Sequence, residues 1–293
     1  MLKGIVLSNI SNLYKVEANN KIYDCSARGK IKNIDLSPVA GDIVTIELQD
    51  KEENVGVIED IEGRKNYIKR PKMANLSQII LVISMKMPKP DLLLLDKQLV
   101  YAEHMNIKPI ICLNKIDLEN DDRINKIHEL YKSIGYDVIK TNAKEEIGVK
   151  EIKKCLENNI TAFSGNSGVG KSTLINCIME KNITEEGNIS HKNKKGKNTT
   201  TQVNLYKIKE NSYIADTPGF STFDVNEIEK EELAKYFVEF RGYLNQCEYA
   251  DCSHIKEERC GIKKGIEEGK ISKERYDRYC QIYEELRNKK KVY

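Results

Sequence analysis

The segment that most constrains the fold is a glycine-rich loop near the middle of the chain. Gly165-Asn166-Ser167-Gly168-Val169-Gly170-Lys171-Ser172 matches the pattern GxxxxGK[ST] in full. It follows the apolar stretch Thr161-Ala162-Phe163 and precedes the helical pattern Thr173-Leu174-Ile175-Asn176. Strand, loop and helix in this order form a phosphate-binding loop, because the glycines let backbone N–H groups converge on phosphate oxygens at a helix N-terminus. The sequence therefore predicts a nucleotide-binding α/β domain.

Two side chains of this loop have specific predicted roles. Lys171 is expected to bridge the β- and γ-phosphates, and the Ser172 hydroxyl is expected to bind Mg²⁺. The predicted phosphate contacts come from the loop and the first helical residues, namely Gly165, Asn166, Ser167, Gly168, Val169, Gly170, Lys171, Ser172 and Thr173.

A second motif predicts which base is bound. Asn114-Lys115-Ile116-Asp117 has the pattern NKxD, the guanine-binding motif of GTPases, and it closes an apolar run at 110–113. The Asp117 carboxylate can accept hydrogen bonds from guanine N1–H and from its N2 amine. Adenine lacks both donors there, so ATP would leave a desolvated carboxylate unpaired at a cost of several kcal/mol. We expect the Lys115 stem to cover the base and Asn114 to brace the loop and reach the base edge.

Two further segments supply predicted magnesium ligands. Asp216-Thr217-Pro218-Gly219 is a DxxG pattern at the end of an apolar run. Asp216 is expected to hold Mg²⁺ through water, and the Gly219 N–H is expected to sense the γ-phosphate. The triple Thr199-Thr200-Thr201 offers a hydroxyl to the same ion, and we favour Thr200 or Thr201. Together with Ser172, these residues form the predicted magnesium site.

The order of the motifs is unusual. Thr141-Asn142-Ala143-Lys144 resembles the SAK-type loop whose backbone N–H meets guanine O6, so Asn142 and Ala143 join the predicted site. An ordinary small GTPase has its phosphate loop first and its NKxD and SAK loops last. Here the last two come first, which is a circular permutation. The chain therefore leaves the domain just after DxxG, and we hypothesise that residues 223–293 report the nucleotide state, which hydrogen exchange with GTP and GDP would test.

Hydropathy patterns divide the 293 residues into three predicted domains. Residues 1–67 contain short alternating stretches typical of strands, which fit an oligonucleotide-binding (OB) barrel, although an SH3-like barrel or a sandwich fragment fits the spacing as well. Residues 68–222 alternate strands with helices, as in βαβ units on a mainly parallel sheet. Residues 223–293 are mostly helical, and the spacing from Tyr276 to Leu286 predicts one amphipathic helix whose tyrosines pack inward.

A cluster of metal-binding residue types lies in the third domain. Cys247, Cys252, His254 and Cys260 form the pattern C-x4-C-x-H-x5-C. Three thiolates and one imidazole complete a tetrahedral zinc site with no open position, so we predict one structural zinc ion that contributes folding energy. The alternative is a group of buried free cysteines beside a surface histidine.

Composition and the chain's N-terminal residues limit the remaining possibilities. The formal net charge of +3 is too small to argue for nucleic-acid binding by bulk electrostatics, although the lysine-rich segment 191–197 leaves local phosphate contacts open. The N-terminus lacks a signal-peptide pattern, and no apolar run is long enough to span a membrane. We therefore expect a cytoplasmic protein with reduced thiols.

With these motifs identified, the chain resembles, over nearly its full length, the family of the small ribosomal subunit biogenesis GTPase RsgA, the YjeQ type. That family combines an OB domain, a permuted GTPase domain with the order NKxD, GxxxxGKS, TTT and DxPG, and a zinc domain with C-x4-C-x-H-x5-C. The resemblance implies a monomeric GTPase that uses magnesium with GTP and binds the 30S subunit and its 16S rRNA late in assembly. It also implies that the OB and zinc domains contact the RNA and that hydrolysis to GDP and phosphate releases the protein.

One segment departs from that family. The family usually has Gly-Arg-His before its threonine triple, and this histidine is considered a water-positioning residue, whereas the present chain has Gly196-Lys197-Asn198. Phe220 follows DxxG, where Ras-like enzymes use glutamine. We therefore assign no catalytic residue and predict slow intrinsic hydrolysis, with the missing group or ordering supplied by the ribosomal subunit.

Two other functions fit parts of the sequence. The first is a permuted GTPase that acts on another ribonucleoprotein particle, and the flanking domains argue against it. The second is an RNA-binding factor in which the nucleotide only switches the conformation. Intact Lys171, Ser172 and Asp216 favour an enzyme over such a passive switch.

Overall fold

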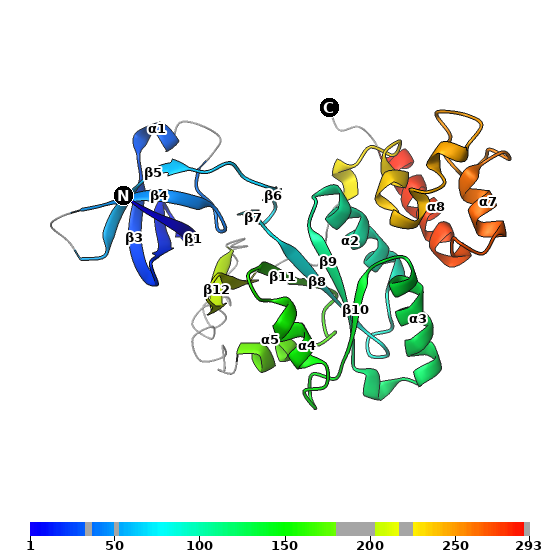
Figure 1. The fold of residues 1–293 in the computed structure, drawn as a ribbon, viewed down its shortest axis with the longest axis horizontal. Coiled ribbons are helices and arrows are strands. Elements are labelled where there is room, and N and C mark those ends of the chain that lie inside the picture. Colours follow the sequence, from blue (N-terminus) through cyan, green and yellow to red (C-terminus); the bar gives the residue numbers. More distant parts are fainter. Residues whose placement is uncertain (33–36, 50–52, 180–202, 217–224, 290–293) are drawn as a thin grey trace. The chain divides into compact units, whose positions relative to one another are not determined.

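The structure is a computed structural model, and it describes residues 1–32, 37–49, 53–179, 203–216 and 225–289 (Figure 1). The chain forms two compact units. The first comprises residues 1–80, 143–164 and 170–221, and the second comprises residues 81–142, 165–169 and 222–293. The predicted domain boundaries after residues 67 and 222 stay a prediction.

The N-terminal part of the first unit is a closed five-stranded barrel, drawn in blue in Figure 1. Its strands pair in the order β1-β2-β3-β5-β4, with β1 antiparallel to β4 and β3 parallel to β5. This is the order of an OB barrel, so the OB prediction is confirmed over its alternatives. The elements are β1 (Leu2–Ile10), β2 (Leu13–Ala18), β3 (Lys21–Ala27), α1 (Gly29–Lys32), β4 (Ile43–Leu48) and β5 (Val55–Ile61).

The barrel is filled by residues that alternate along its strands. Val16, Val44 and Ile58 are completely buried in its interior. Gly4 allows β1 to approach β2, because a Cβ atom there would lie only 2.6 Å from the carbonyl oxygen of Glu17. The period-two hydropathy pattern of the sequence thus corresponds to a real inner face.

A six-stranded sheet forms the α/β part, with the strand order β10-β9-β8-β11-β13-β12. The pairs β9–β10 and β11–β13 are parallel, whereas β12 and β13 form an antiparallel hairpin. The apolar runs before the NKxD motif (110–113) and before the phosphate loop (161–163) lie within observed strands. The strands are β8 (Gln78–Ser84), β9 (Lys108–Asn114), β10 (Asp137–Thr141), β11 (Ile160–Ser164), β12 (Asn204–Lys209) and β13 (Ser212–Asp216).

Helices connect these strands in the alternating pattern that the sequence predicts. The helix at Val149–Cys155 ends ahead of Asn158, whose positive φ of 57° is incompatible with a continuing helix. A small hairpin of β6 (Tyr67–Lys69) and β7 (Lys72–Ala74) was not predicted. The helices are α2 (Leu92–His104), the 3₁₀ turn η1 (Ile116–Leu118), α3 (Asp121–Ser133), α4 (Val149–Cys155) and α5 (Lys171–Met179).

The C-terminal segment is helical and has an aromatic core. Phe237, Phe240 and Tyr279 pack with ring centroids 5.1–5.2 Å apart. Tyr276 and Tyr279 are buried, which confirms that this helix face packs inward. The elements are η3 (Val225–Glu227), η4 (Leu233–Tyr236), η5 (Val238–Phe240), η6 (Leu244–Gln246), α7 (Gly261–Glu267) and α8 (Lys273–Asn288).

No helix within the described ranges is both long enough and apolar enough to cross a membrane.

Candidate nucleotide-binding site and metal centre

The NKxD loop and the first part of the phosphate loop are bonded directly to each other. The buried Asn114, at the end of β9, donates from Nδ2 to the carbonyl oxygen of Val169 at 2.8 Å. Lys115 Nζ donates to the carbonyl oxygen of Gly168 at 2.7 Å and also to that of Met87. Two motifs that are more than 50 residues apart in the chain therefore meet, which is what a shared ligand requires.

The residues of the NKxD loop differ in their contacts. Lys115 has a left-handed backbone with φ 60°, which starts the short turn η1, and Asp117 within that turn is exposed. The brace predicted for Asn114 is present as its bond to the phosphate loop. Because Asn114 and Lys115 hold the phosphate loop, the exposed Asp117 carboxylate is the group of this motif that faces solvent and can accept hydrogen bonds from a base.

Thr141, the first residue of the SAK-like segment, is a buried member of the same network, and the sequence assigned it no role. Its hydroxyl lies 3.0 Å from Asn114 Oδ1, to which it donates, and 3.2 Å from the Cys112 sulfur. Burial raises the pKa of the Cys112 thiol to about 12, although its hydrogen bond with Thr141 opposes this shift. Thr141 thus joins the end of β10 to the NKxD loop. Its position directly before the predicted Asn142-Ala143 pair was the available signal.

Asn142 and Ala143 are buried immediately after β10. The Ala143 carbonyl accepts a hydrogen bond from the thiol of Cys177 on α5, at 3.2 Å. The role that the sequence assigns to this loop, a backbone N–H that meets guanine O6, stays a prediction.

The phosphate loop has the backbone geometry that its glycines predict. Gly165 has φ 143°, and a Cβ atom there would lie 2.1 Å from the carbonyl oxygen of Val82, so only glycine fits. Gly168 has φ 77°, in the left-handed region. A side chain at either position would displace the loop from the strand β8 or strain its backbone.

The remaining predicted phosphate and magnesium residues lie at element ends. Lys171, Ser172 and Thr173 form the first turn of α5, and Ser172 and Thr173 are exposed there. Partial burial lowers the pKa of the Lys171 ammonium, and a bound phosphate would oppose that shift because it stabilises the charge. Asp216 is exposed at the end of β13.

Several predicted residues lie outside the described ranges. They are Gly219, the threonine triple with Thr200 and Thr201, the segment Gly196-Lys197-Asn198, and Phe220.

The Cys/His residues form one compact donor cluster. The donor atoms of Cys247, Cys252, His254 and Cys260 all lie within 4.8 Å of one another. His254 Nδ1 is 3.4 Å from the sulfurs of Cys247 and Cys260, which are 3.9 Å apart. Zinc–sulfur bonds of about 2.3 Å at tetrahedral angles place sulfurs about 3.8 Å apart, so this donor set fits zinc.

Burial disfavours the thiolate form of one ligand of this cluster. Burial raises the pKa of the Cys252 thiol to about 12. A bound divalent ion reverses such a shift because it stabilises the thiolate.

A second layer of hydrogen bonds holds the loop that carries these ligands. Glu257 accepts from the N–H and hydroxyl of Ser253 and from the N–H of Ile255, at 2.9–3.2 Å. Although partial burial raises the pKa of Glu257, these bonds outweigh it and hold the value at about 2. The hydroxyls of Tyr276 and Tyr279 on α8 donate to the carbonyls of His254 and Ser253, at 2.8 and 2.9 Å.

Comparison with known proteins supplies the context for both sites. The profile of the RsgA GTPase family matches residues 61–226, and that of the RsgA N-terminal domain matches residues 3–58. The chain belongs to the RsgA GTPase family. The resemblance inferred from the sequence is therefore confirmed, and the chain is a GTP-hydrolysing enzyme of this family.

The RsgA relatives match over nearly their whole length. The proteins called small ribosomal subunit biogenesis GTPase RsgA from Clostridium novyi and Ruminiclostridium cellulolyticum are 43% and 40% identical, over 97% and 98% of this chain and 97% and 95% of their own lengths. The crystal structure of YjeQ from Thermotoga maritima has a TM-score of 0.84 at 37% identity and covers 99% of each chain. YloQ, described as a circularly permuted GTPase, has a TM-score of 0.83 at 31% identity and covers 100% of this chain and 97% of its own. The predicted multidomain fold with a permuted GTPase is thereby confirmed.

The Glu257→Gln substitution tests the support of the predicted zinc site. We expect zinc to dissociate about 10-fold faster, because the loss of an outer hydrogen-bonding partner typically weakens metal binding about 10- to 100-fold. Transfer of zinc from the purified protein to a chromophoric chelator measures this rate. Glu258→Gln, at the exposed neighbouring position, is the control and should leave the rate unchanged. Equal rates in the two variants would show that Glu257 does not support the site.

Proposed function

We propose that this RsgA-family GTPase binds GTP between its NKxD and phosphate loops and acts in late maturation of the small ribosomal subunit. The observation that supports nucleotide binding most strongly is the contact of Asn114 and Lys115 with the carbonyls of Val169 and Gly168. The curated relatives, named small ribosomal subunit biogenesis GTPases, support the subunit as the partner.

The proposed nucleotide site assigns each motif one task. Gly165 to Thr173 hold the phosphates, with Lys171 on the β- and γ-phosphates. Asp117 accepts from guanine, while Asn142 and Ala143 offer backbone N–H groups to its O6. Mg²⁺, which supplies charge neutralisation between the phosphates when bound, is held by Ser172, Asp216 and a hydroxyl of Thr200 or Thr201, and Gly219 senses the γ-phosphate.

We propose zinc as the ion of the Cys/His cluster, in a structural role. The cluster offers four protein ligands, so no position is left for a substrate or a reactive water. The ion therefore has a structural role and takes no part in catalysis.

The finer partner assignments are also proposals. We infer contacts of the barrel and the zinc-bearing segment with 16S rRNA, action as a monomer, and a location in the cytoplasm, where the small subunit is assembled. These inferences rest on the family, and the closed OB-type barrel supports the first of them because such barrels bind nucleic acids on their strand faces and loops.

Stimulation by the 30S subunit tests this function. We expect slow GTP hydrolysis by the isolated protein and an increase of at least about 10-fold with 30S subunits, because groups supplied in trans can accelerate GTP hydrolysis by far more. Phosphate release with 30S subunits, with 50S subunits and without either measures the effect. Equal stimulation by 50S subunits would favour another particle, and no stimulation by either would favour a passive switch.

A further inference from the structure

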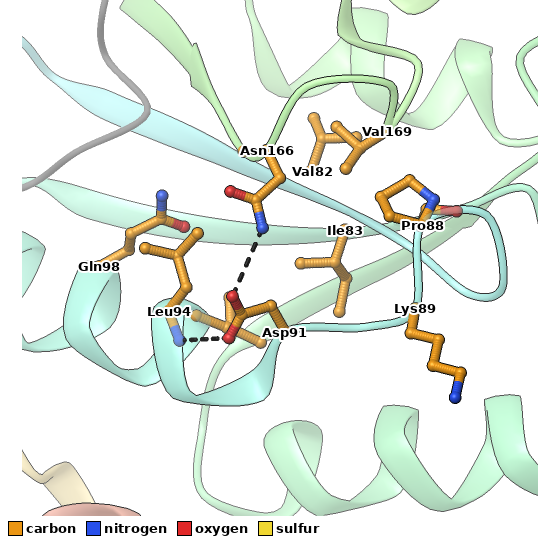
Figure 2. A pocket seen from close by; sticks show the side chains of 12 residues that line it. Val82, Ile83, Pro88, Lys89, Asp91, Leu94, Gln98, Asn166 and Val169 are labelled. Carbon is orange, nitrogen blue, oxygen red and sulfur yellow. Dashed lines mark hydrogen bonds between the residues drawn. The ribbon is translucent and has the colours of Figure 1, made fainter. Parts of the chain in front are cut away.

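Helix α2 contacts the phosphate loop through its N-terminal cap. Asp91 caps the helix by accepting from the Leu94 N–H at 2.9 Å with Oδ1. Its other oxygen, Oδ2, accepts from the side chain of Asn166 in the phosphate loop at 3.4 Å, as Figure 2 shows. Leu94 and Gln98 on α2 and Asn166 and Val169 of the phosphate loop line one small pocket beside this bond (Figure 2).

The same helix contacts α8 through a buried carboxylate. Asp96 is completely buried and forms ion pairs with Arg275 and Arg278 of α8. It also accepts from the hydroxyl of Tyr131 on α3 at 2.8 Å. One carboxylate thus joins α2 and α3 to α8, which lies far from both in the sequence.

Arg275 is buried among two carboxylates and two aromatic rings. It is 1% exposed, pairs with Glu239 as well as Asp96, and lies 5.0 Å from the ring centroid of Phe237 and 5.3 Å from that of Tyr131. Removing one partner of a buried ion pair typically costs about 3–5 kcal/mol, because a charge is left uncompensated. Independent motion of α2 and α8 would break such pairs, so the two helices are expected to move together.

Helix α8 in turn holds the metal-binding loop. Tyr276 and Tyr279, on the turn that follows Arg275, donate to the carbonyls of His254 and Ser253. A continuous series of contacts therefore runs from Asn166 in the phosphate loop through α2 and α8 to the loop between the metal ligands.

We propose that α2 couples the phosphate loop to the metal-binding loop, with Asp91 and Asp96 as positioning residues at its two contact points. Nucleotide binding at residues 165–169 then changes the stability of the loop at 247–260, independently of the chain connection after DxxG. Such coupling is reciprocal, so a partner that binds the metal-binding loop changes nucleotide affinity by the same factor. The proposal rests on nucleotide binding at the phosphate loop.

The test is amide hydrogen exchange of residues 247–260 in the full-length, zinc-loaded protein. Saturating GDP is compared with a saturating, non-hydrolysable GTP analogue. For the wild type we expect exchange in this loop to differ at least about fivefold between the two nucleotides, the lower end of common allosteric couplings. Nucleotide affinity and zinc content are measured on the same samples, so a loss of nucleotide binding is distinguished from a loss of coupling.

Asp91→Ser is the decisive variant. The serine hydroxyl still caps α2, but the side chain has no second oxygen to accept from Asn166. We expect the nucleotide-dependent difference to fall below about twofold, well under common couplings, with zinc content unchanged. Lys97→Ala, which removes a partly exposed ion pair between α2 and Glu285 of α8, should retain the wild-type difference.

Asp96→Asn, at the other contact point, should reduce the nucleotide-dependent difference as well. If Asp96→Asn does not fold, Asp91→Ser still tests the proposal. A wild-type protein that binds both nucleotides but shows no difference at 247–260 would overturn the proposal. So would a full difference in Asp91→Ser.

Discussion

The Asp117→Asn substitution is expected to weaken GTP binding by at least about 100-fold, because sites built to hydrogen-bond a polar group typically reject its mismatch by about 10⁴-fold or more. The carboxylate accepts from guanine N1–H and from the N2 amine, whereas an asparagine side chain would present an N–H group toward one of those donors. Xanthine has a carbonyl at C2 in place of the amine. We therefore expect the variant to gain affinity for xanthosine triphosphate.

Binding of fluorescent GTP and competition by xanthosine triphosphate measure both parts of this prediction. Asp122→Asn, which changes another exposed carboxylate close by in the chain, is the matched control and should bind GTP as the wild type does. The surroundings of Asp117 should survive the substitution, since Asn114 and Lys115, not Asp117, hold the phosphate loop. Wild-type GTP affinity in Asp117→Asn would remove this motif from the proposed site.

The Cys260→Ser substitution is expected to abolish stoichiometric zinc binding and to unfold the loop at 247–260. Structural zinc ions contribute about 10–16 kcal/mol of apparent binding free energy at neutral pH, which is comparable to the usual unfolding free energy of a whole domain, about 5–15 kcal/mol. Cys260 is buried and lies near both Cys247 and His254, and the donor cluster holds no fifth His, Cys, Asp or Glu among the described residues. Metal analysis and hydrogen exchange of the purified variant test this.

Cys280→Ser is the control for this prediction. Cys280 is a half-buried cysteine on α8 that does not belong to the donor cluster, so its replacement should leave zinc content at one ion per chain. Chelation of zinc from the wild type should reproduce the Cys260→Ser result. A Cys260→Ser protein that retains one zinc ion and wild-type protection at 247–260 would contradict a structural zinc site.

The regular features of this fold could be predicted because they leave periodic or local signals. Alternating apolar residues marked the barrel strands, and short apolar runs bounded by polar residues marked the sheet. The phosphate loop was evident because Gly165 and its neighbouring glycines adopt backbone conformations that other residues avoid. The spacing of the cysteines and the histidine marked a donor cluster because these four residues lie close to one another in the sequence.

Contacts between buried polar groups could not be predicted, because their partners are distant in the chain and no pattern pairs them. Thr141 and Asn114 are 27 residues apart, and Asp96 and Arg275 are 179 apart. In the sequence, Asp96 and Arg275 resemble ordinary surface charges on helices. Only the packing of α2 against α8 shows that they are buried and paired.

Calorimetric titration of the purified protein with GTP and with ATP, in the presence of Mg²⁺, tests whether two loops distant in sequence bind one guanine nucleotide. We predict one site per chain and GTP affinity at least about 100-fold above that for ATP, since ATP leaves the Asp117 carboxylate without its donors. Equal affinity for both nucleotides, or binding of neither, would contradict the account.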